Sequence, residues 1–297
     1  MSTESSLRRS LLGIPGNERG LVSGALDSEA DEIFLDLEDS LGPGEKGAAR
    51  SALIDIVADH DWVDRGLSYR INGTDTRWWY DDVVEVVKAA GGAIDTLIIP
   101  KVRDPADVKA VEKLLASVEM NTGLPAGAVG LSAQIETAEG MNAVTDIAHA
   151  SDRLTAIIFG PADYAASIGA AHGATDYPGH YWHYPLSRLS HAAASAGLLA
   201  IGGPYTDGDH TGFEQACRYE RALGYDGKVV IHPEQVATAN EAFAPDIAEA
   251  QRAKEIVEQY ESADADAVVA IDGNVIDREM YRMAARILAK AEEADLV

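Results

Sequence analysis

Residues 32–39 read EIFLDLED, a short apolar run that ends in carboxylates. Comparable apolar, β-branched runs recur along the chain as LLGI, LSYRI, DTLIIP, VGLSAQI, LTAIIF, LLAIGG and VVIHP. Short runs of this kind, bounded by glycine, proline or charged residues, are typical of strands buried on both faces of a parallel sheet. The sequence therefore predicts eight strands, each of which ends in polar or small residues.

The segments between these runs have the periodicity of helices. Residues 78–90 (WWYDDVVEVVKAA) and 105–120 (PADVKAVEKLLASVEM) carry apolar residues at helical spacing, and Pro105 suits a first helical turn. Eight strands alternating with helices predict an α/β fold, a closed (β/α)8 TIM barrel. No glycine-rich phosphate loop follows an early strand, which weakens the alternative of an open, doubly wound nucleotide-binding sheet.

The alternation of strand and helix ends at about residue 245. The segments PDIAEAQRAKEIVEQY and REMYRMAARILAKAEEA read as helices, and AVVAIDGNVID between them reads as a short segment with a turn. We therefore expect a barrel catalytic domain over residues 1–245. Residues 246–297 are expected to form a C-terminal helical lid or arm.

Composition restricts the class of protein. Apolar residues make up 46% of the 297 residues, but no run approaches the roughly 18 apolar residues of a membrane span. The first residues, MSTESSLRRS, lack the apolar segment of a secretion signal, so we expect a cytoplasmic protein. The single cysteine, Cys217, excludes an internal disulfide framework and a cysteine-based zinc site.

The chain is strongly acidic, with 49 acidic and 24 basic residues and a formal net charge of −25. Such a surface repels nucleic acid and anionic lipid, so we expect neither as a partner. The acidic residues are spread along the chain, which has only eight lysines. This pattern is similar to that of halophilic enzymes, in which concentrated salt screens the repulsion. The alternative is an ordinary acidic protein.

Glu136 and Asp163 are the first candidate site residues. Each follows an apolar strand run, in LSAQIE and IIFGPAD, and adjacent strands of a barrel would bring the two carboxylates together at their carboxyl ends. Two such carboxylates repel unless one is protonated or a cation lies between them. Oxygen ligands favour Mg²⁺, or Mn²⁺, over zinc. The alternative is that both acids cap helices or lie in their first turns.

Glu38 and Asp39, at the end of FLDLED, would surround that metal site and accept hydrogen bonds from metal-bound waters. We predict that a divalent cation, assisted by Arg70 and Lys101, compensates this negative charge. Arg70 ends a strand run, where a guanidinium can grip a substrate carboxylate; alternatively it is an internal partner of Asp36 or Glu38.

Lys101, in LIIPKV, raises the possibility of a Schiff-base aldolase, which needs a lysine with a lowered pKa. Nearby carboxylates should instead raise the pKa of Lys101, so this mechanism is disfavoured. His232 is expected to be a hydrogen-bonded structural residue rather than a base.

Several motifs occur in an order and spacing that are specific in combination: RSLLGIPGN, DEIFLDLEDS with GEKGAAR, YRINGTDT, LIIPKV, AQIETAEG, IIFGPADYAASIG, GYDGKVVIHPEQ and GNVID. Over nearly its whole length the chain resembles the citrate lyase β-subunit and malyl-CoA lyase family, the acyl-CoA branch of the HpcH/HpaI aldolase superfamily.

This resemblance implies roles for particular residues. Glu136 and Asp163 would hold Mg²⁺, and Arg70 would contact the oxoacid. Asp277, in GNVID, would act as acid and base from an arm that covers a neighbouring subunit's site in a homotrimer or homohexamer. Composition alone would make Asp277 a turn residue.

The implied reaction is the reversible cleavage of a 3-hydroxyacyl-CoA, such as malyl-CoA, methylmalyl-CoA or citramalyl-CoA. Its products would be acetyl-CoA or propionyl-CoA and glyoxylate or pyruvate. Arg9 and Arg19 are candidates for contacts with the CoA phosphates, and Lys101 and Pro161 are further candidate binding residues.

Three other functions remain open. A class II aldolase that forms a pyruvate enolate would need no CoA, but the long arm with GNVID argues against it. A malyl-CoA thioesterase, or a malate-synthase-like enzyme, would use the same fold and metal. A citrate lyase β-subunit would act on a citryl thioester together with an acyl-carrier partner.

Overall fold

A computed structural model describes residues 7–62, 65–170, 182–262, 269–271, 274–294 and 296–297. The chain divides into two compact units, and each is described here by itself. The larger unit is Arg8–Phe243, and the smaller is formed mainly by Ala244–Val297.

The larger unit is a closed barrel of eight parallel strands that are hydrogen-bonded in sequence order, with β1 pairing with β8 to close it. The strands are β1 (Ser10–Pro15), β2 (Glu32–Asp36), β3 (Gly66–Arg70), β4 (Thr96–Ile99), β5 (Gly130–Ile135), β6 (Leu154–Phe159), β7 (Leu199–Gly202) and β8 (Gly227–Val230). The predicted TIM barrel is confirmed, and each of the eight apolar runs overlaps one of its strands.

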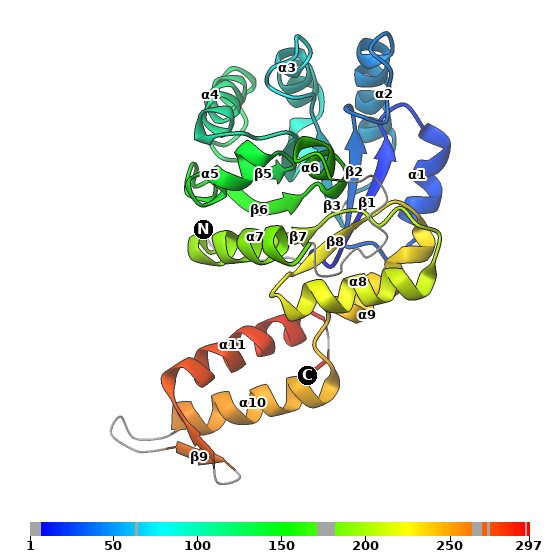
Figure 1. Cartoon of the computed structure of the whole chain (residues 1–297). Helices are drawn as coiled ribbons and strands as arrows, with labels where there is room; N and C mark the ends of the chain where they lie inside the picture. Colours follow the sequence, from blue (N-terminus) through cyan, green and yellow to red (C-terminus); the bar gives the residue numbers. More distant parts are fainter. Residues whose placement is uncertain (1–6, 63–64, 171–181, 263–268, 272–273, 295) are drawn as a thin grey trace. The chain divides into compact units, whose positions relative to one another are not determined.

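Helices surround the barrel on the outside (Figure 1). They are α1 (Arg19–Leu26), α2 (Lys46–Asp59), α3 (Trp79–Ala90), α4 (Pro105–Thr122), α5 (Ala138–Ala148), α6 (Pro161–Ser167), α7 (His183–Ala196), α8 (His210–Ala222) and α9 (Val236–Phe243). The helices predicted at 78–90 and 105–120 correspond to α3 and α4. Pro105 is at the start of α4, whose N-cap, Asp104, forms a capping box with Asp107.

The interior of the barrel is layered, because alternate residues of each strand point inward. At the amino-terminal end, Arg8 pairs with Glu32 at 2.6 Å and donates a hydrogen bond to Thr155 Oγ1 at 3.1 Å. Above this pair lies an apolar cluster made of Leu11, Phe34, Ile98, Ala156, Ile158, Ile201 and Val229. The layer at the carboxyl-terminal end is polar again, and it contains the candidate site.

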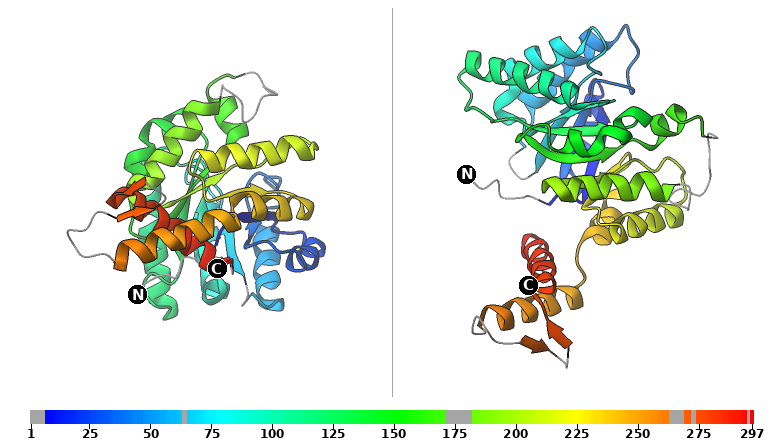
Figure 2. Two further views of the ribbon diagram at one scale, coloured as in Figure 1. Left: turned by 90° about the horizontal axis from the view of Figure 1, so that it is seen from below. Right: turned by 60° about the vertical axis from the view of Figure 1, so that its left-hand side comes forward.

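The smaller unit is a helical hairpin. Helices α10 (Ile247–Ser262) and α11 (Arg278–Glu293) lie side by side (Figures 1 and 2), and the rings of Tyr260 and Tyr281 stack between them with centroids 4.5 Å apart. Strands β9 (Val269–Ile271) and β10 (Asn274–Ile276) form an antiparallel pair between the two helices. Both predicted C-terminal helices are present, whereas residues 272–273 of the predicted turn lie outside the described residues.

None of the helices in the described ranges is both long and apolar enough to cross a membrane.

A fully buried ion pair connects the barrel to its outer layer. Lys228 of β8 donates to both carboxylate oxygens of Glu220 of α8, at 2.7 and 2.9 Å, and both side chains are 0% exposed. A Cβ on Gly202 of β7 would lie 2.0 Å from the Glu220 carboxylate, so the strand needs glycine there. A buried charge is tolerated only when it is paired, which makes this contact sensitive to loss of one partner.

We expect Lys228→Met to destabilise the protein by ~3–5 kcal/mol, because it leaves the Glu220 carboxylate buried without its cation. The matched control is Lys228→Met combined with Glu220→Gln, which removes both charges and should recover much of the loss. Urea unfolding followed by circular dichroism measures both. A single variant as stable as the wild type would contradict this account of the pair.

Candidate active site

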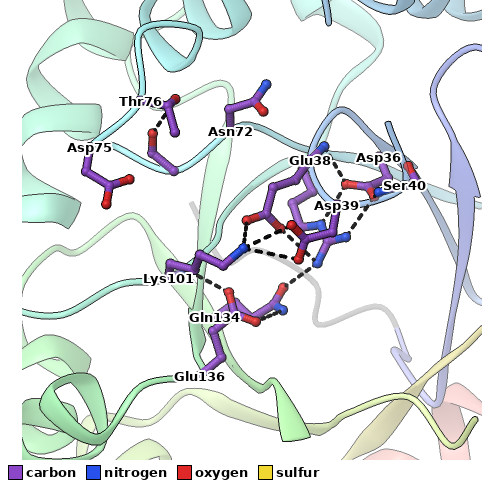
Figure 3. Close-up of polar contacts among 12 residues, drawn as sticks. Asp36, Glu38, Asp39, Ser40, Asn72, Asp75, Thr76, Lys101, Gln134 and Glu136 are labelled. Carbon is purple, nitrogen blue, oxygen red and sulfur yellow. Dashed lines mark hydrogen bonds and ion pairs between the residues drawn. The ribbon is translucent and has the colours of Figure 1, made fainter. Parts of the chain in front are cut away.

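Glu136 directly follows β5 and is almost fully buried, with 1% of its surface exposed. Its Oε1 accepts a hydrogen bond from the Lys101 backbone N–H at 2.7 Å, and its Oε2 accepts one from Gln134 Nε2 at 2.6 Å (Figure 3). Burial, followed by the negative charge of Glu38, raises the pKa of Glu136 to about 8, although the Arg70 charge acts in the opposite direction. This carboxyl group therefore lacks a cation sufficient to hold it ionised.

Asp163 lies in the first turn of α6, after β6, and its charge also raises the pKa of Glu136. The neighbouring strands β5 and β6 thus bring the two acids into one centre, as their positions in the sequence predicted. Glu136 is not a helix cap, because Thr137 caps α5. The alternative that both acids cap helices or lie in their first turns therefore describes only Asp163.

Gly160, between β6 and α6, permits this arrangement. A Cβ at this position would lie 2.3 Å from Glu136 Oε2 and 2.5 Å from Glu136 Cβ. Real Cβ atoms do not approach other atoms so closely, so only glycine leaves room for the Glu136 side chain. The backbone of β6 is in this way shaped around the carboxylate.

Arg70, the last residue of β3, is held by Asp36, the last residue of β2. The two residues are register partners, and Nε and Nη2 of Arg70 each donate to one Asp36 oxygen at 2.7 Å. Burial would raise the pKa of Asp36, but the Arg70 charge and the hydrogen bonds outweigh it and lower that pKa. The internal pairing considered for Arg70 is therefore present, and only Nη1 is directed elsewhere, with Gln134 Oε1 at 3.4 Å and Glu38 Oε2 at 3.3 Å.

Lys101 follows β4 by two residues and has a φ of 51°, which is unique among the described non-glycine residues. Its ammonium donates to Glu38 Oε1 at 2.7 Å and to the two Asp39 oxygens at 3.0 and 3.1 Å (Figure 3). Burial would lower the pKa of Lys101, but these carboxylates outweigh it and raise that pKa. The predicted direction is confirmed, and a raised pKa argues against a Schiff-base lysine.

The two cations that were predicted to assist in compensating FLDLED, Arg70 and Lys101, are both paired with its acids. Asp36 pairs with Arg70, whereas Glu38 and Asp39 share the single charge of Lys101, and burial still raises the pKa of Glu38. Among the described residues, no group of three or more His, Cys, Asp or Glu side chains is arranged to hold a metal.

The pair Glu136 and Asp163 nevertheless fits Mg²⁺. This ion takes oxygen ligands, needs only one or two carboxylates, and keeps several waters. A buried carboxyl with a raised pKa is the group that a nearby dication would stabilise in its charged form.

The remaining candidates are distributed over different parts of the chain. Arg9 precedes β1, at the amino-terminal end of the barrel, and is bonded through Nε and Nη2 to Asp31. This placement, away from the carboxyl-terminal end, argues against the predicted contact with CoA. Arg19 is exposed and paired with Asp59, whereas Pro161 starts α6 and packs against Gly203.

Asp277 lies in the smaller unit, where it caps α11 by accepting a hydrogen bond from the Met280 N–H at 2.8 Å. It is exposed and therefore open to other contacts. The structure assigns it a local role, and its chemical role remains a prediction from the resemblance.

Gln134 was missed in the sequence analysis. It points from β5 toward Glu136 on one side and Arg70 on the other, and links the two. A signal was available, because Gln134 lies two residues before Glu136 on the same strand and therefore on the same face. Glutamine within an apolar strand run needs hydrogen-bond partners when it is buried.

A buried polar centre at the carboxyl-terminal end of a TIM barrel is the usual location of an enzyme active site in this fold. Comparison with known proteins identifies the class. Residues 9–233 match the model of the HpcH/HpaI aldolase/citrate lyase family. The chain belongs to this family, and it is a lyase.

Two relatives are similar along their whole length. An L-malyl-CoA/β-methylmalyl-CoA lyase of Rhodobacter capsulatus is 37% identical over 97% of this chain and 96% of its own. A citrate lyase subunit β of Leuconostoc mesenteroides subsp. cremoris is 32% identical over 98% of this chain and 95% of its own.

Among solved structures, the protein CitE of Mycobacterium tuberculosis in complex with magnesium, acetoacetate and coenzyme A is similar, with a TM-score of 0.76 and 26% identity. The match covers 97% of this chain and 99% of that one. RipC of Yersinia pestis has a TM-score of 0.66 and 31% identity, over 84% of this chain and 99% of its own.

We expect Gly160→Ala to displace the Glu136 carboxylate and to reduce activity by ~10²-fold, since a misplacement of about 1 Å can have this effect. The matched control is Gly47→Ala in α2, where an added Cβ has no neighbour within 4 Å. Mg²⁺ binding by calorimetry and initial rates are the measurements. Equal losses in the two variants would show that crowding at Glu136 is not the cause.

The raised pKa of Glu136 also predicts a dependence of stability on pH in metal-free protein. Between its ordinary value of 4.5 and about 8, the native state keeps a proton that the unfolded state releases. The free energy of unfolding contributed by this group should therefore fall as pH rises, by up to ~1.4 kcal/mol per pH unit.

Urea unfolding in a chelator, for wild type and Glu136→Gln across this pH window, isolates the effect of the one group. The stability of the wild type relative to the variant should decline with rising pH. A difference that stays constant would mean that Glu136 is not protonated in the native metal-free state.

Proposed function

We propose that this lyase reversibly cleaves a 3-hydroxyacyl-CoA of the malyl-CoA type into acetyl-CoA or propionyl-CoA and glyoxylate or pyruvate. The observation that carries the proposal is the buried Glu136 carboxyl, whose pKa is affected by the charges of both Asp163 and Arg70. Asp36 holds Nε and Nη2 of Arg70, and Nη1 is directed toward Gln134 and Glu38. Similarity to the malyl-CoA/β-methylmalyl-CoA lyase over 97% of this chain supports the choice of substrate.

Glu136 and Asp163 would hold Mg²⁺, with Mn²⁺ as a substitute. When bound, the ion supplies Lewis-acid polarisation of the oxoacid carbonyl. Arg70 would use Nη1 to bind the oxygen on which negative charge develops, while Asp36 holds Nε and Nη2 in place. Glu38 and Asp39 would line this centre and keep Lys101 beside it.

Asp277 would remove the α-proton of the acyl-CoA in the condensing direction and return it during cleavage. We propose that it comes from the arm of a neighbouring subunit in a homotrimer or homohexamer. Support comes from its exposed position in a separate compact unit and from the resemblance of GNVID to the family's motif.

The acidic composition supports a second part of the proposal, adaptation to concentrated salt. The net charge of −25 favours self-repulsion at low ionic strength, which salt screens. Assays of this protein are therefore best done at both low and high KCl.

A second candidate function is favoured by the 32% identity to a citrate lyase subunit β. In this case the substrate would be a citryl thioester on an acyl-carrier partner rather than a free CoA ester. Thioester hydrolysis, as in a malyl-CoA thioesterase or a malate-synthase-like reaction, would differ only in its products.

The test is incubation of purified protein with Mg²⁺ and a panel of malyl-CoA, methylmalyl-CoA and citramalyl-CoA, with separation of the products by liquid chromatography. We expect a shortened acyl-CoA and an oxoacid, and we expect loss of activity with a chelator or with Glu136→Gln. Free CoA and an intact hydroxyacid would instead indicate hydrolysis. Activity only on a citryl group attached to a carrier protein would favour the citrate lyase function.

Subunit complementation tests the role of Asp277. Asp277→Asn and Glu136→Gln should each reduce activity by at least ~10²-fold, since general acid–base catalysis contributes about this much. Co-expression of the two variants should restore part of the activity, because mixed oligomers then contain some sites with both residues intact. A mixture as inactive as its components would rule out action of Asp277 across subunits.

A further inference from the structure

The backbone at Lys101 adopts a conformation that an L-residue rarely holds. Its φ of 51° is the single positive value among the described non-glycine residues, and Lys101 is not in a glycine-rich turn. Such a conformation persists only where the surrounding contacts determine it, and these conformations are frequent at functional sites. At Lys101 two contacts do so, one from the backbone and one from the side chain.

The backbone contact is to the candidate metal ligand. The Lys101 N–H donates to Glu136 Oε1 at 2.7 Å, and this bond depends on how the chain turns after β4. The side-chain contact is to the acids that follow β2, since the ammonium reaches Glu38 and Asp39 (Figure 3). One residue therefore joins two groups of carboxylates that come from different strands.

The ammonium lies at a point where three carboxylate oxygens converge. Glu38 Oε1 is 2.7 Å away, and the two Asp39 oxygens are 3.0 and 3.1 Å away. An ammonium has three N–H donors, and these contacts need only two of them, one for Glu38 and one shared by the two Asp39 oxygens. The ammonium is therefore held between the two acids.

The surroundings explain why a cation is needed at this point. Glu38 is 5% exposed, and its Oε2 is 3.3 Å from Arg70 Nη1 without the geometry of a hydrogen bond. Arg70 is engaged mainly by Asp36. Without Lys101, Glu38 would keep only the longer contact with Arg70. The Asp39 side chain is 53% exposed, so ions in the solvent could then reach the oxygens of both acids.

We propose that Lys101 is a positioning residue whose ammonium occupies a cation position between Glu38 and Asp39, so that the centre accepts one divalent ion rather than two. The inference rests on the proposed function for the ion held by Glu136 and Asp163. The three oxygens that surround the ammonium would need to close by about 0.5 Å to suit Ca²⁺, and by more to suit a smaller divalent cation such as Mn²⁺. Lys101 keeps that second ion out and holds the acids beside Arg70.

The experiment counts bound Mn²⁺ in purified protein by electron paramagnetic resonance of the free ion. We expect about one ion per chain in the wild type and about two in Lys101→Ala, which opens the position between the acids. The matched control, Lys101→Arg, retains both the positive charge and the Cβ at the same φ, and it should keep one ion. Adding Glu38→Gln to Lys101→Ala should return the count to one, because residue 38 then no longer offers a charged oxygen to the second ion.

Each outcome decides between the two claims. One ion in Lys101→Ala, with a raised KM for the acyl-CoA, would overturn the inference and return Lys101 to substrate binding. Two ions in Lys101→Arg would also overturn it, because the charge would then not be the cause. No ion in the wild type but one in Lys101→Ala would support the inference and would refute the proposed ion at Glu136 and Asp163.

Circular dichroism and thermal unfolding establish that each variant is folded before its ions are counted. Lys101→Met serves as a second neutral variant if Lys101→Ala does not fold. A loss of stability alone would not change the number of bound ions, so the count separates a positioning role from a merely structural one.

Discussion

The centre depends on a balance between carboxylates and two fixed cations at the mouth of the barrel. Arg70 pairs with Asp36, and Glu38 and Asp39 share the single charge of Lys101. Arg70 ends β3, which pairs with the strand that carries Asp36, and Lys101 follows β4, the next strand of the barrel. The order of the parallel strands therefore brings these cations and acids together. Glu136 is left without a comparable partner, and burial, followed by the charge of Glu38, raises its pKa.

Much of the fold could be predicted because it follows from local pattern. Apolar runs of four to six residues separated by amphipathic segments allow few arrangements, and eight of them allow the closed barrel. The location of Glu136 and Asp163 in one centre also followed, since β5 and β6 are adjacent and polar residues after their ends must meet. The bounds of α3 and α4 agreed with prediction to within two residues.

The partners of the charged residues could not be read from the sequence in the same way. Arg9 and Arg70 lie one residue before β1 and at the end of β3, so they belong to opposite ends of the barrel. The sequence does not show which partner a long side chain reaches, and the bonds from Arg9 to Asp31 were not predicted. Gln134 was missed because it is uncharged, although it donates a hydrogen bond to Glu136.

Glu38 and Asp39 are paired with a lysine, whereas Glu136 is not, and this difference explains why a dication would favour the site at Glu136. A position between Glu38 and Asp39 already contains an ammonium that is hydrogen-bonded to three oxygens, and an ion entering there would have to displace it. Within the described part of the chain, the hydrogen-bond donors to Glu136 are a backbone N–H and an amide, which stabilise a carboxylate much less than a full positive charge does. An entering ion would be bound most favourably where a buried carboxylate has the least positive charge beside it. In this barrel that carboxylate is Glu136 rather than one of the acids after β2.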